Sequence, residues 1–276
     1  MTDSLSLLVI IGLGAMGVVV GSFLNVVIAR VPAGVSITRP RSSCPGCGAF
    51  IESRDNVPLV SWLLLRGRCR HCQEPISMRY PLVEGLTGIL WALIGGWSLG
   101  QSGTALSPLL PTLLIVVSAG VALVFIDLDC HRLPDSIVLP LWPVTLVGLV
   151  FAGIMSGEWP IGRALAAAGL WLLVIGGIWL VTSGRGMGLG DVKLAPVLGV
   201  ILGWVGWGPA VVGLACAWFI GGGVALVLLM ARRARRGEAV PFGPFLFSGF
   251  LVGVLAGSML MNAYLSGTGL SALGGG

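Results

Sequence analysis

Four aspartates in two short segments are the residues best suited to acid–base chemistry. Asp127, Asp129 and Asp135 lie in Phe-Ile-Asp-Leu-Asp-Cys-His-Arg-Leu-Pro-Asp after an apolar stretch, and Asp191 ends the segment Gly-Leu-Gly-Asp at 188–191. Acidic residues next to membrane spans are scarce and are functional candidates. Two carboxyl groups that share a proton can activate water for amide hydrolysis. Asp127 or Asp129 is therefore a candidate partner for Asp191.

Other roles for these charged residues remain open at this point. Asp135 follows a proline and precedes an apolar run, so its simplest role is a helix N-cap. Asp191 can also be a cap, and Asp127 and Asp129 can be solvated at a span end. Lys193 either neutralises a nearby acid or marks the cytoplasmic side. The glycines Gly188 and Gly190 would let backbone and substrate approach Asp191 closely.

Two further classes of protein compete with a hydrolase. An ion or solute transporter also uses intramembrane acids, but it predicts acids near the bilayer midplane and broken helices there. The aspartates in this chain are expected at helix ends. A membrane scaffold without chemistry would leave both aspartate segments unexplained.

Four cysteines form two pairs in the one long polar segment of the chain. The pairs are Cys44-Pro-Gly-Cys47 and Cys69-Arg-His-Cys72, with 21 residues between them. This spacing is typical of a tetrahedral four-cysteine zinc site, in which the metal adds folding energy to a segment too short to bury a core. The spacing favours structural zinc over disulfides or free thiols.

The remaining thiols and the histidine of the polar segment have simpler roles. Cys130 and Cys216 are isolated in the sequence and are interpreted as packing residues. His71 lies inside the second cysteine pair and is expected beside the metal site or at the surface.

The composition indicates an all-α integral membrane protein. Of the 276 residues, 56% are hydrophobic and 10% are charged, and the mean hydropathy is +0.99. A soluble domain carries about 25% charged residues. Apolar stretches long enough to span a bilayer predict about eight helices. They lie near 5–28, 82–99, 109–127, 137–155, 163–183, 191–206, 209–231 and 243–264. The first is interpreted as a retained helix, and its glycines at 12, 14, 17 and 21 are expected to permit close helix packing.

The positions of the basic residues predict the orientation in the membrane. With eight helices and the N-terminus outside, fifteen of the sixteen Lys and Arg residues fall on one side, and Arg163 alone falls on the other. The positive-inside rule assigns the crowded side to the cytoplasm. The net charge of +5 follows from this topology and requires no nucleic-acid partner. The arginines at 232, 233, 235 and 236 are also expected to attract anionic lipid.

Several segments together resemble the bacterial type IV prepilin peptidases, or prepilin leader peptidase/N-methyltransferases. They occur in the order of that family and cover most of 21–193. They are the segments at 21–32, 40–47, 57–72 and 76–84, the aspartate segment that contains Leu-Pro-Asp at 133–135, and Gly-Leu-Gly-Asp at 188–191.

This resemblance implies an inner-membrane aspartic peptidase whose catalytic acids match Asp127, seven residues before Pro134, and Asp191. It favours Asp127 over Asp129. It further implies cleavage of the leader of prepilins or pseudopilins at the cytoplasmic face. N-methylation with S-adenosylmethionine as the methyl donor follows in many members. The insert resembles that of the members with both activities, although 35–39 lacks the glutamate that many members carry there.

The expected organisation therefore has three parts. Residues 1–29 form the first transmembrane helix, residues 30–80 form a cytoplasmic zinc-binding insert associated with methyl transfer, and residues 81–276 form the peptidase helices.

Overall fold

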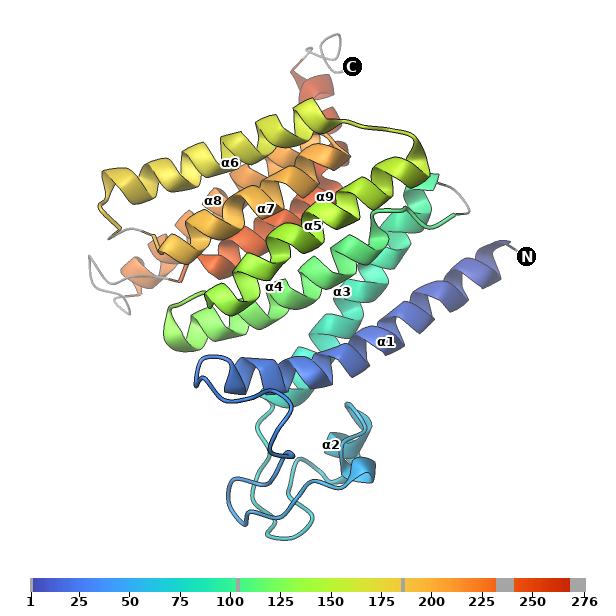
Figure 1. Ribbon diagram of the computed structural model, residues 1–276, viewed down its shortest axis with the longest axis vertical. Helices are drawn as coiled ribbons and strands as arrows, with labels where there is room; N and C mark the ends of the chain where they lie inside the picture. Colours follow the sequence, from blue (N-terminus) through green and yellow to red (C-terminus); the bar gives the residue numbers. More distant parts are fainter. Residues whose placement is uncertain (1, 103–104, 185–186, 232–240, 269–276) are drawn as a thin grey trace. The chain divides into compact units, whose positions relative to one another are not determined.

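The computed structural model describes residues 2–102, 105–184, 187–231 and 241–268, which are mostly helical outside the insert (Figure 1). The eight long helices agree with the predicted ones to within a few residues. They are α1 (Thr2–Arg30), α3 (Arg79–Ser102), α4 (Leu110–Cys130), α5 (Asp135–Ser156), α6 (Ile161–Val181), α7 (Leu189–Val205), α8 (Trp207–Met230) and α9 (Gly243–Gly267). Two short helices, η1 (Ser53–Asp55) and α2 (Val60–Leu64), lie in the insert.

Within the described ranges, seven helices are long and apolar enough to cross a membrane. The eighth, α7, has 17 residues and a proline, Pro196, inside it. Many leucine and valine side chains on these helices are exposed, among them Leu173, with 72% of its surface accessible. Such apolar side chains suit contact with lipid. The helical backbone also satisfies its own hydrogen bonds, as the bilayer core requires of any element that crosses it. The prediction of an all-α membrane protein is confirmed.

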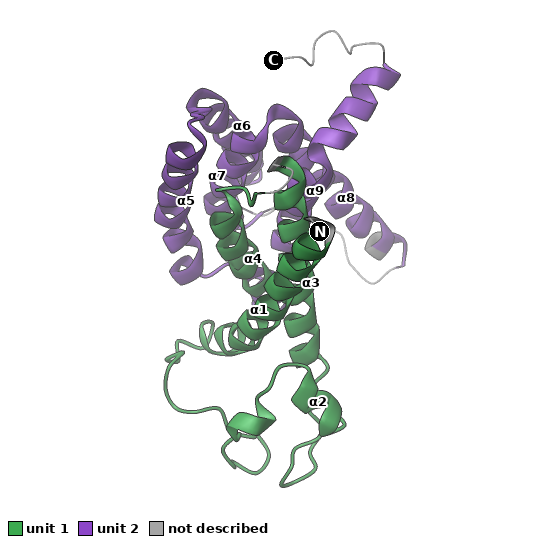
Figure 2. Ribbon diagram, turned by 90° about the vertical axis from the view of Figure 1, so that its right-hand side faces the viewer, with its two compact units in different colours: residues 1–122 green, residues 123–276 purple. Residues whose placement is uncertain are grey.

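The chain divides into two compact units, residues 1–122 and 123–276 (Figure 2). In unit 1, α1 packs against α3 through small residues. A Cβ added at Gly21 would lie 2.7 Å from the Cα of Glu84, and one at Gly17 would lie 2.8 Å from the Cβ of Trp91. These glycines permit the close helix packing that the sequence predicts. The prediction is wrong for Gly12, which has no atom within 4 Å of an added Cβ.

The insert of unit 1 contains two similar turns, one for each cysteine pair. An isolated bridge joins Ser43 to Phe50, and another joins Arg68 to Pro75. In each turn the backbone N–H of the first cysteine donates to the carbonyl five residues later, with N···O distances of 2.9 Å from Cys44 and 2.8 Å from Cys69. The two cysteine segments therefore fold alike although only the first contains glycine.

In unit 2, α6 packs against α7 and α8 packs against α9. Gly199 of α7 allows the contact with α6, because an added Cβ would lie 2.9 Å from the Cβ of the fully buried Trp171. Arg163 of α6 donates to the carbonyls of Gly203 and Trp204 at 2.7 and 2.8 Å. Carbonyls at a helix C-terminus have no intrahelical partner, so Arg163 stabilises the end of α7. This packing fixes α7, which carries Asp191.

Candidate active site and metal centre

Asp127 is buried in the last turn of α4. Only 5% of its surface is accessible. Its Oδ2 accepts a hydrogen bond of 3.0 Å from the backbone N–H of Gly243, the first residue of α9. The first N–H groups of a helix lack intrahelical acceptors, and the helix dipole favours negative charge there. The start of α9 therefore supplies a donor to the Asp127 carboxylate.

Asp191 lies in the first turn of α7 and is equally buried, with 5% of its surface accessible. Its Oδ2 accepts a hydrogen bond of 3.1 Å from the N–H of Gly188, so Asp191 does cap its own helix. Its other oxygen, Oδ1, is buried without a hydrogen-bond partner among the described residues. A buried polar atom without a partner is costly and is common at functional sites.

The carboxylates of Asp127 and Asp191 are close enough for their charges to interact. Leu133, in the turn between α4 and α5, lies next to Gly190, which precedes Asp191, and next to Gly243, which donates to Asp127. A Cβ added at Gly190 would lie 2.6 Å from the Cβ of Leu133, and one at Gly243 would lie 3.3 Å from its Cδ2. Unit 2 thus brings together two acids from separate helices, with glycine backbone at Gly190 and Gly243 packed against the same leucine.

The neighbouring charged residues take other places. Asp129 is exposed, in contrast to Asp127. The prediction that Asp135 caps α5 is wrong, because Pro134 occupies the N-cap and makes no side-chain cap hydrogen bond. Asp135 instead accepts hydrogen bonds of 2.7 and 2.8 Å from the Lys193 ammonium. Lys193 therefore does neutralise an acid, and this ion pair links α5 to α7.

The four cysteines of the insert form one cluster, as their spacing predicts. The Sγ atoms of Cys44, Cys47, Cys69 and Cys72 lie within 4.8 Å of one another, and none of these cysteines is in a disulfide. The Sγ atoms of Cys44 and Cys72 are 3.7 Å apart. Tetrahedral zinc with Zn–S bonds of about 2.3 Å places its sulfur atoms about 3.8 Å apart. The cluster can hold a metal ion of that size.

The backbone of the insert favours a thiolate at one of these positions. The N–H groups of Cys72 and His71 lower the pKa of Cys69 to about 6. For Cys72, the N–H of Glu74 acts in the same direction, but desolvation and the neighbouring sulfur atoms outweigh it and raise the pKa to about 12. Four sulfur atoms this close cannot all be ionised unless a cation offsets their repulsion.

Other predictions for the thiols and basic residues have mixed outcomes. His71 is exposed, as expected. The interpretation of Cys130 as a packing residue is wrong, since its side chain is exposed at the end of α4, and Cys216 is half-buried. The arginines at 185, 232, 233, 235 and 236 lie outside the described residues.

Gly243 is not among the site residues predicted from the sequence. The segment Pro-Phe-Gly-Pro at 241–244 places a proline in the first turn of α9, where the missing N–H costs nothing. This signal marks a helix start next to the basic segment at 232–236. It gives no indication that the helix start meets Asp127.

Comparisons with known proteins identify the family of the chain. Residues 15–97 match the model of the bacterial peptidase A24 N-terminal domain, and residues 114–231 match that of the type IV leader peptidase family. No solved structure matches the chain.

Three bacterial relatives carry the name prepilin leader peptidase/N-methyltransferase. The protein of Aeromonas hydrophila is 37% identical over an alignment of 275 residues, gaps included, and the match covers 90% of each chain. That of Stutzerimonas stutzeri is 35% identical over an alignment of 280 residues, and the match covers 91% of each chain. That of Neisseria gonorrhoeae is 37% identical over an alignment of 269 residues, and the match covers 86% of this chain and 87% of the relative. The two family models and the length of these matches show that this chain belongs to the type IV leader peptidase family.

Proposed function

We propose that this protein is a membrane aspartic endopeptidase that cleaves the leader peptide of type IV prepilins or pseudopilins and then methylates the new N-terminal residue. Family membership and the name of the relatives support this function. The observation that carries the proteolytic part is the meeting of two buried carboxyl groups, from α4 and α7, in one unit.

The proposed catalytic residues are Asp127 and Asp191, which hold one proton between them. The ionised carboxylate takes a proton from water, whose oxygen attacks the carbonyl carbon of the scissile peptide bond. The protonated carboxyl group donates to the carbonyl oxygen. When the C–N bond breaks, the nitrogen takes up a proton from the pair and leaves as the amine. The unpaired Oδ1 of Asp191 supports this role, because no described residue competes with water or substrate for a hydrogen bond to it.

The topology proposed for the chain suits a prepilin substrate. We place the N-terminus outside the bacterial inner membrane, and the insert and the two acids at the cytoplasmic face. A prepilin has a charged leader in the cytoplasm followed by an apolar helix in the bilayer. Its scissile bond then lies at the depth of Asp127 and Asp191, and the apolar helix docks laterally against the peptidase helices at 81–276.

We propose that the metal of the cysteine cluster is zinc and that its role is structural. Four thiolates complete a tetrahedral shell, so no coordination position remains for water or substrate. The metal would hold together the two turns of the insert at 30–80, which follows the first transmembrane helix at 1–29. This insert is the part that we associate with methyl transfer.

The methyl donor proposed for the second reaction is S-adenosylmethionine. It supplies a methyl group on a positively charged sulfonium, which a neutral amine can attack. The described residues fit such a cation. The carboxyl group of Glu84 is buried at the start of α3, and only 7% of Glu84 is accessible.

Cleavage of a full-length prepilin by the purified protein in detergent tests the peptidase assignment. Mass spectrometry would show whether the leader is removed. The variants Asp127→Asn and Asp191→Asn should each lose at least about a thousandfold in rate, as expected when a member of a catalytic pair is removed. Asp129→Asn is the matched control, because its carboxyl group is exposed two residues from Asp127. Cleavage by either dyad variant at the unmodified rate would refute its catalytic role.

The proposed orientation has a separate test. Cysteines introduced one at a time into the variant that lacks Cys130 and Cys216, and that keeps the four cysteines of the metal cluster, can be labelled in intact cells with an impermeant maleimide. A cysteine at Glu158, in the exposed loop between α5 and α6, should react from outside, whereas one at Glu52 of the insert should not. The reverse pattern would contradict the assignment of the insert to the cytoplasm.

A further inference from the structure

A cavity of about 550 Å³ lies in unit 1, between the insert and the adjoining ends of α1 and α3. This volume falls in the range of roughly 300–1,000 Å³ that is typical of small-molecule sites. Six side chains of different chemistry in its lining are Asn25, Leu59, Trp62, Arg70, Tyr80 and Glu84. The peptidase pair in unit 2 makes no use of this cavity.

Glu84 is the buried charge of the cavity. Its Oε2 accepts a hydrogen bond of 2.7 Å from the backbone N–H of Leu59. In the part of the chain that the structure describes, no cationic side chain pairs with Glu84. The two oxygens of a buried carboxyl group can accept more than this one hydrogen bond. Glu84 therefore offers a partner to the cationic group of a ligand, in a cavity whose lining also includes Arg30, Arg41 and Arg70.

The backbone around Leu59 is held in a strained conformation next to Glu84. Leu59 has φ 60° and ψ −49°, and the N–H of Val60 donates to the carbonyl of Pro58 at 2.6 Å. This is the rare form of γ-turn with positive φ, which persists only where the surrounding structure stabilises it. The turn leaves the Leu59 N–H free to donate to Glu84, so strain and the buried charge occur together at the cavity wall.

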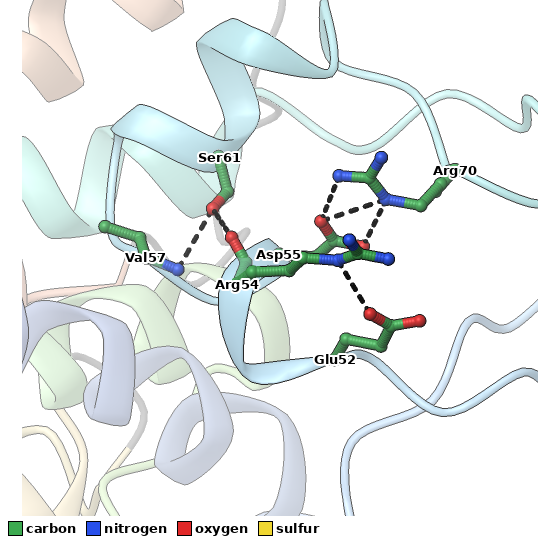
Figure 3. A network of polar contacts seen from close by, with 6 residues as sticks. All are labelled: Glu52, Arg54, Asp55, Val57, Ser61 and Arg70. Carbon is green, nitrogen blue, oxygen red and sulfur yellow. Dashed lines mark hydrogen bonds and ion pairs between the residues drawn. The ribbon is translucent and has the colours of Figure 1, made fainter.

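Polar contacts hold the rest of the lining in place. Figure 3 shows that Ser61 donates to the carbonyl of Arg54 and accepts from the N–H of Val57, at 2.9 and 3.0 Å. In the same network Arg70 forms a bidentate ion pair with Asp55. A wall fixed in this way is suited to small-molecule recognition, because little side-chain freedom is lost on binding.

Two further side chains supply groups that a nucleoside can use. The indole N–H of Trp62 donates to the carbonyl of Ile76 at 3.2 Å, and the ring lies against Gly67, where an added Cβ would be 2.8 Å from Cζ2 of Trp62. Asn25 is buried, with 8% of its surface accessible, and its amide donates to the carbonyl of Tyr80 at 3.2 Å. An aromatic ring in a fixed position can stack on a base or contact a cation through its face.

We propose that this cavity binds S-adenosylmethionine, with Glu84 balancing the positive charge of the donor and Trp62 offering a ring face. The proposal rests on the methyltransferase part of the proposed function and is independent of the peptidase pair. A cationic nucleoside accounts for three observations together: the cavity volume, the buried unpaired carboxylate and the aromatic ring. A basic leader peptide would satisfy the charge alone.

Equilibrium binding to the full chain in detergent micelles tests the charge recognition. The two probes are S-adenosylmethionine and S-adenosylhomocysteine, which lacks the methyl group and the sulfonium charge. The unmodified protein should bind the charged probe more tightly. Glu84→Gln keeps an oxygen for the Leu59 N–H but removes the charge. The affinity for S-adenosylmethionine should therefore fall at least about tenfold, and the affinity for S-adenosylhomocysteine should fall much less. The matched control Glu158→Gln, in an exposed loop of unit 2, should bind both as the unmodified protein does.

A second measurement does not depend on any variant folding. Ultraviolet cross-linking of radioactive S-adenosylmethionine to the unmodified protein should place the label on peptides within 22–84. Label confined to 123–268 would overturn the proposal. In the binding experiment, so would a Glu84→Gln variant whose affinity for each probe equals that of the unmodified protein. If no label appears within 22–84 and the cavity instead binds a basic leader peptide through Glu84, the proposal is also overturned and the cavity is a leader site.

The variant Asp127→Asn/Asp191→Asn separates this proposal from the peptidase assignment. It should bind S-adenosylmethionine with unchanged affinity although it cleaves no prepilin. Loss of donor binding in this variant, with zinc content and thermal stability intact, would show that the donor site does not lie in the cavity of unit 1.

Discussion

Asp127 and Gly243 lie 116 residues apart in the chain, yet the backbone N–H of Gly243 donates to the Asp127 carboxylate over 3.0 Å. The contact joins the end of α4 to the start of α9. It gives one proposed catalytic acid a donor whose position is set by a helix terminus rather than by a flexible side chain. Gly243 is thus a positioning residue for Asp127.

Gly243→Ala should impair cleavage more than folding. The added Cβ would lie 2.7 Å from Oδ2 of Asp127, so the carboxylate must move. Displacement of a catalytic group by about 1 Å can reduce a rate about a hundredfold. We expect a loss of that size in kcat, with KM little changed. Gly162→Ala is the matched control, because Gly162 lies in the first turn of α6 with no atom within 4 Å of an added Cβ. Equal rates in both variants would contradict the positioning role.

Replacement of Lys193 should have a small effect on stability. Its ion pair with Asp135 links α5 to α7 but is partly exposed, and such pairs contribute about 0–1 kcal/mol. Lys193→Met should therefore lower the thermal midpoint by only about 1–3 °C. The exchange Asp135→Lys/Lys193→Asp should recover part of this loss. If the double variant lowers the thermal midpoint by more than the summed decreases of Asp135→Lys and Lys193→Asp, the ion pair is not the stabilising contact.

The cysteine cluster predicts one zinc ion per chain. Elemental analysis of the purified protein should find it, and Cys69→Ser should remove it because a tetrahedral site needs all four thiolates. Cys216→Ser is the control and should retain full zinc content. The apo insert should become sensitive to protease, since zinc binding contributes directly to the folding of small segments. Undiminished zinc in Cys69→Ser would exclude this cluster as the metal site.

The Asp55–Arg70 ion pair predicts a pH-dependent contribution to the stability of the insert. Hydrogen bonding to Arg70 holds the pKa of Asp55 below its usual 3.8. A carboxyl group whose pKa is lower in the folded state stabilises that state above the pKa of the unfolded chain, and the contribution disappears as the pH falls through the folded-state pKa.

Amide hydrogen exchange of the insert can measure this contribution. At neutral pH, Asp55→Asn should exchange about two- to fivefold faster than the unmodified protein, as expected for an exposed pair. As the pH falls through the folded-state pKa of Asp55, the difference between the two proteins should shrink and then disappear. A difference that does not shrink as the pH falls would assign the stabilisation to something other than the charge.

The helices and the metal cluster were predictable from the sequence for local reasons. Long apolar stretches must be helical in lipid, and breaks such as that between Gly203 and Pro209 agree with the boundary between α7 and α8. Two Cys-x-x-Cys pairs predict their own cluster, because each short turn already directs two thiols to one side.

Other features depend on packing between distant segments. The local sequence predicts that Asp135 is an N-cap, but the ammonium of Lys193, 58 residues away, binds its carboxylate. Burial distinguishes Asp127 from the exposed Asp129, whereas their local sequences do not. Likewise, Glu84 could be recognised as a buried charge only once α1 and the insert were seen to enclose it.

The sequence by itself determined that the chain crosses a membrane, where its helices lie, and which acids and thiols are available for chemistry. These properties follow from composition and short-range spacing, which act within one element. Only the tertiary structure decided that Gly243 donates to Asp127, that Oδ1 of Asp191 has no hydrogen-bond partner among the described residues and that Glu84 borders a cavity. Such contacts join residues far apart in the chain, and their existence depends on how close the helix backbones approach.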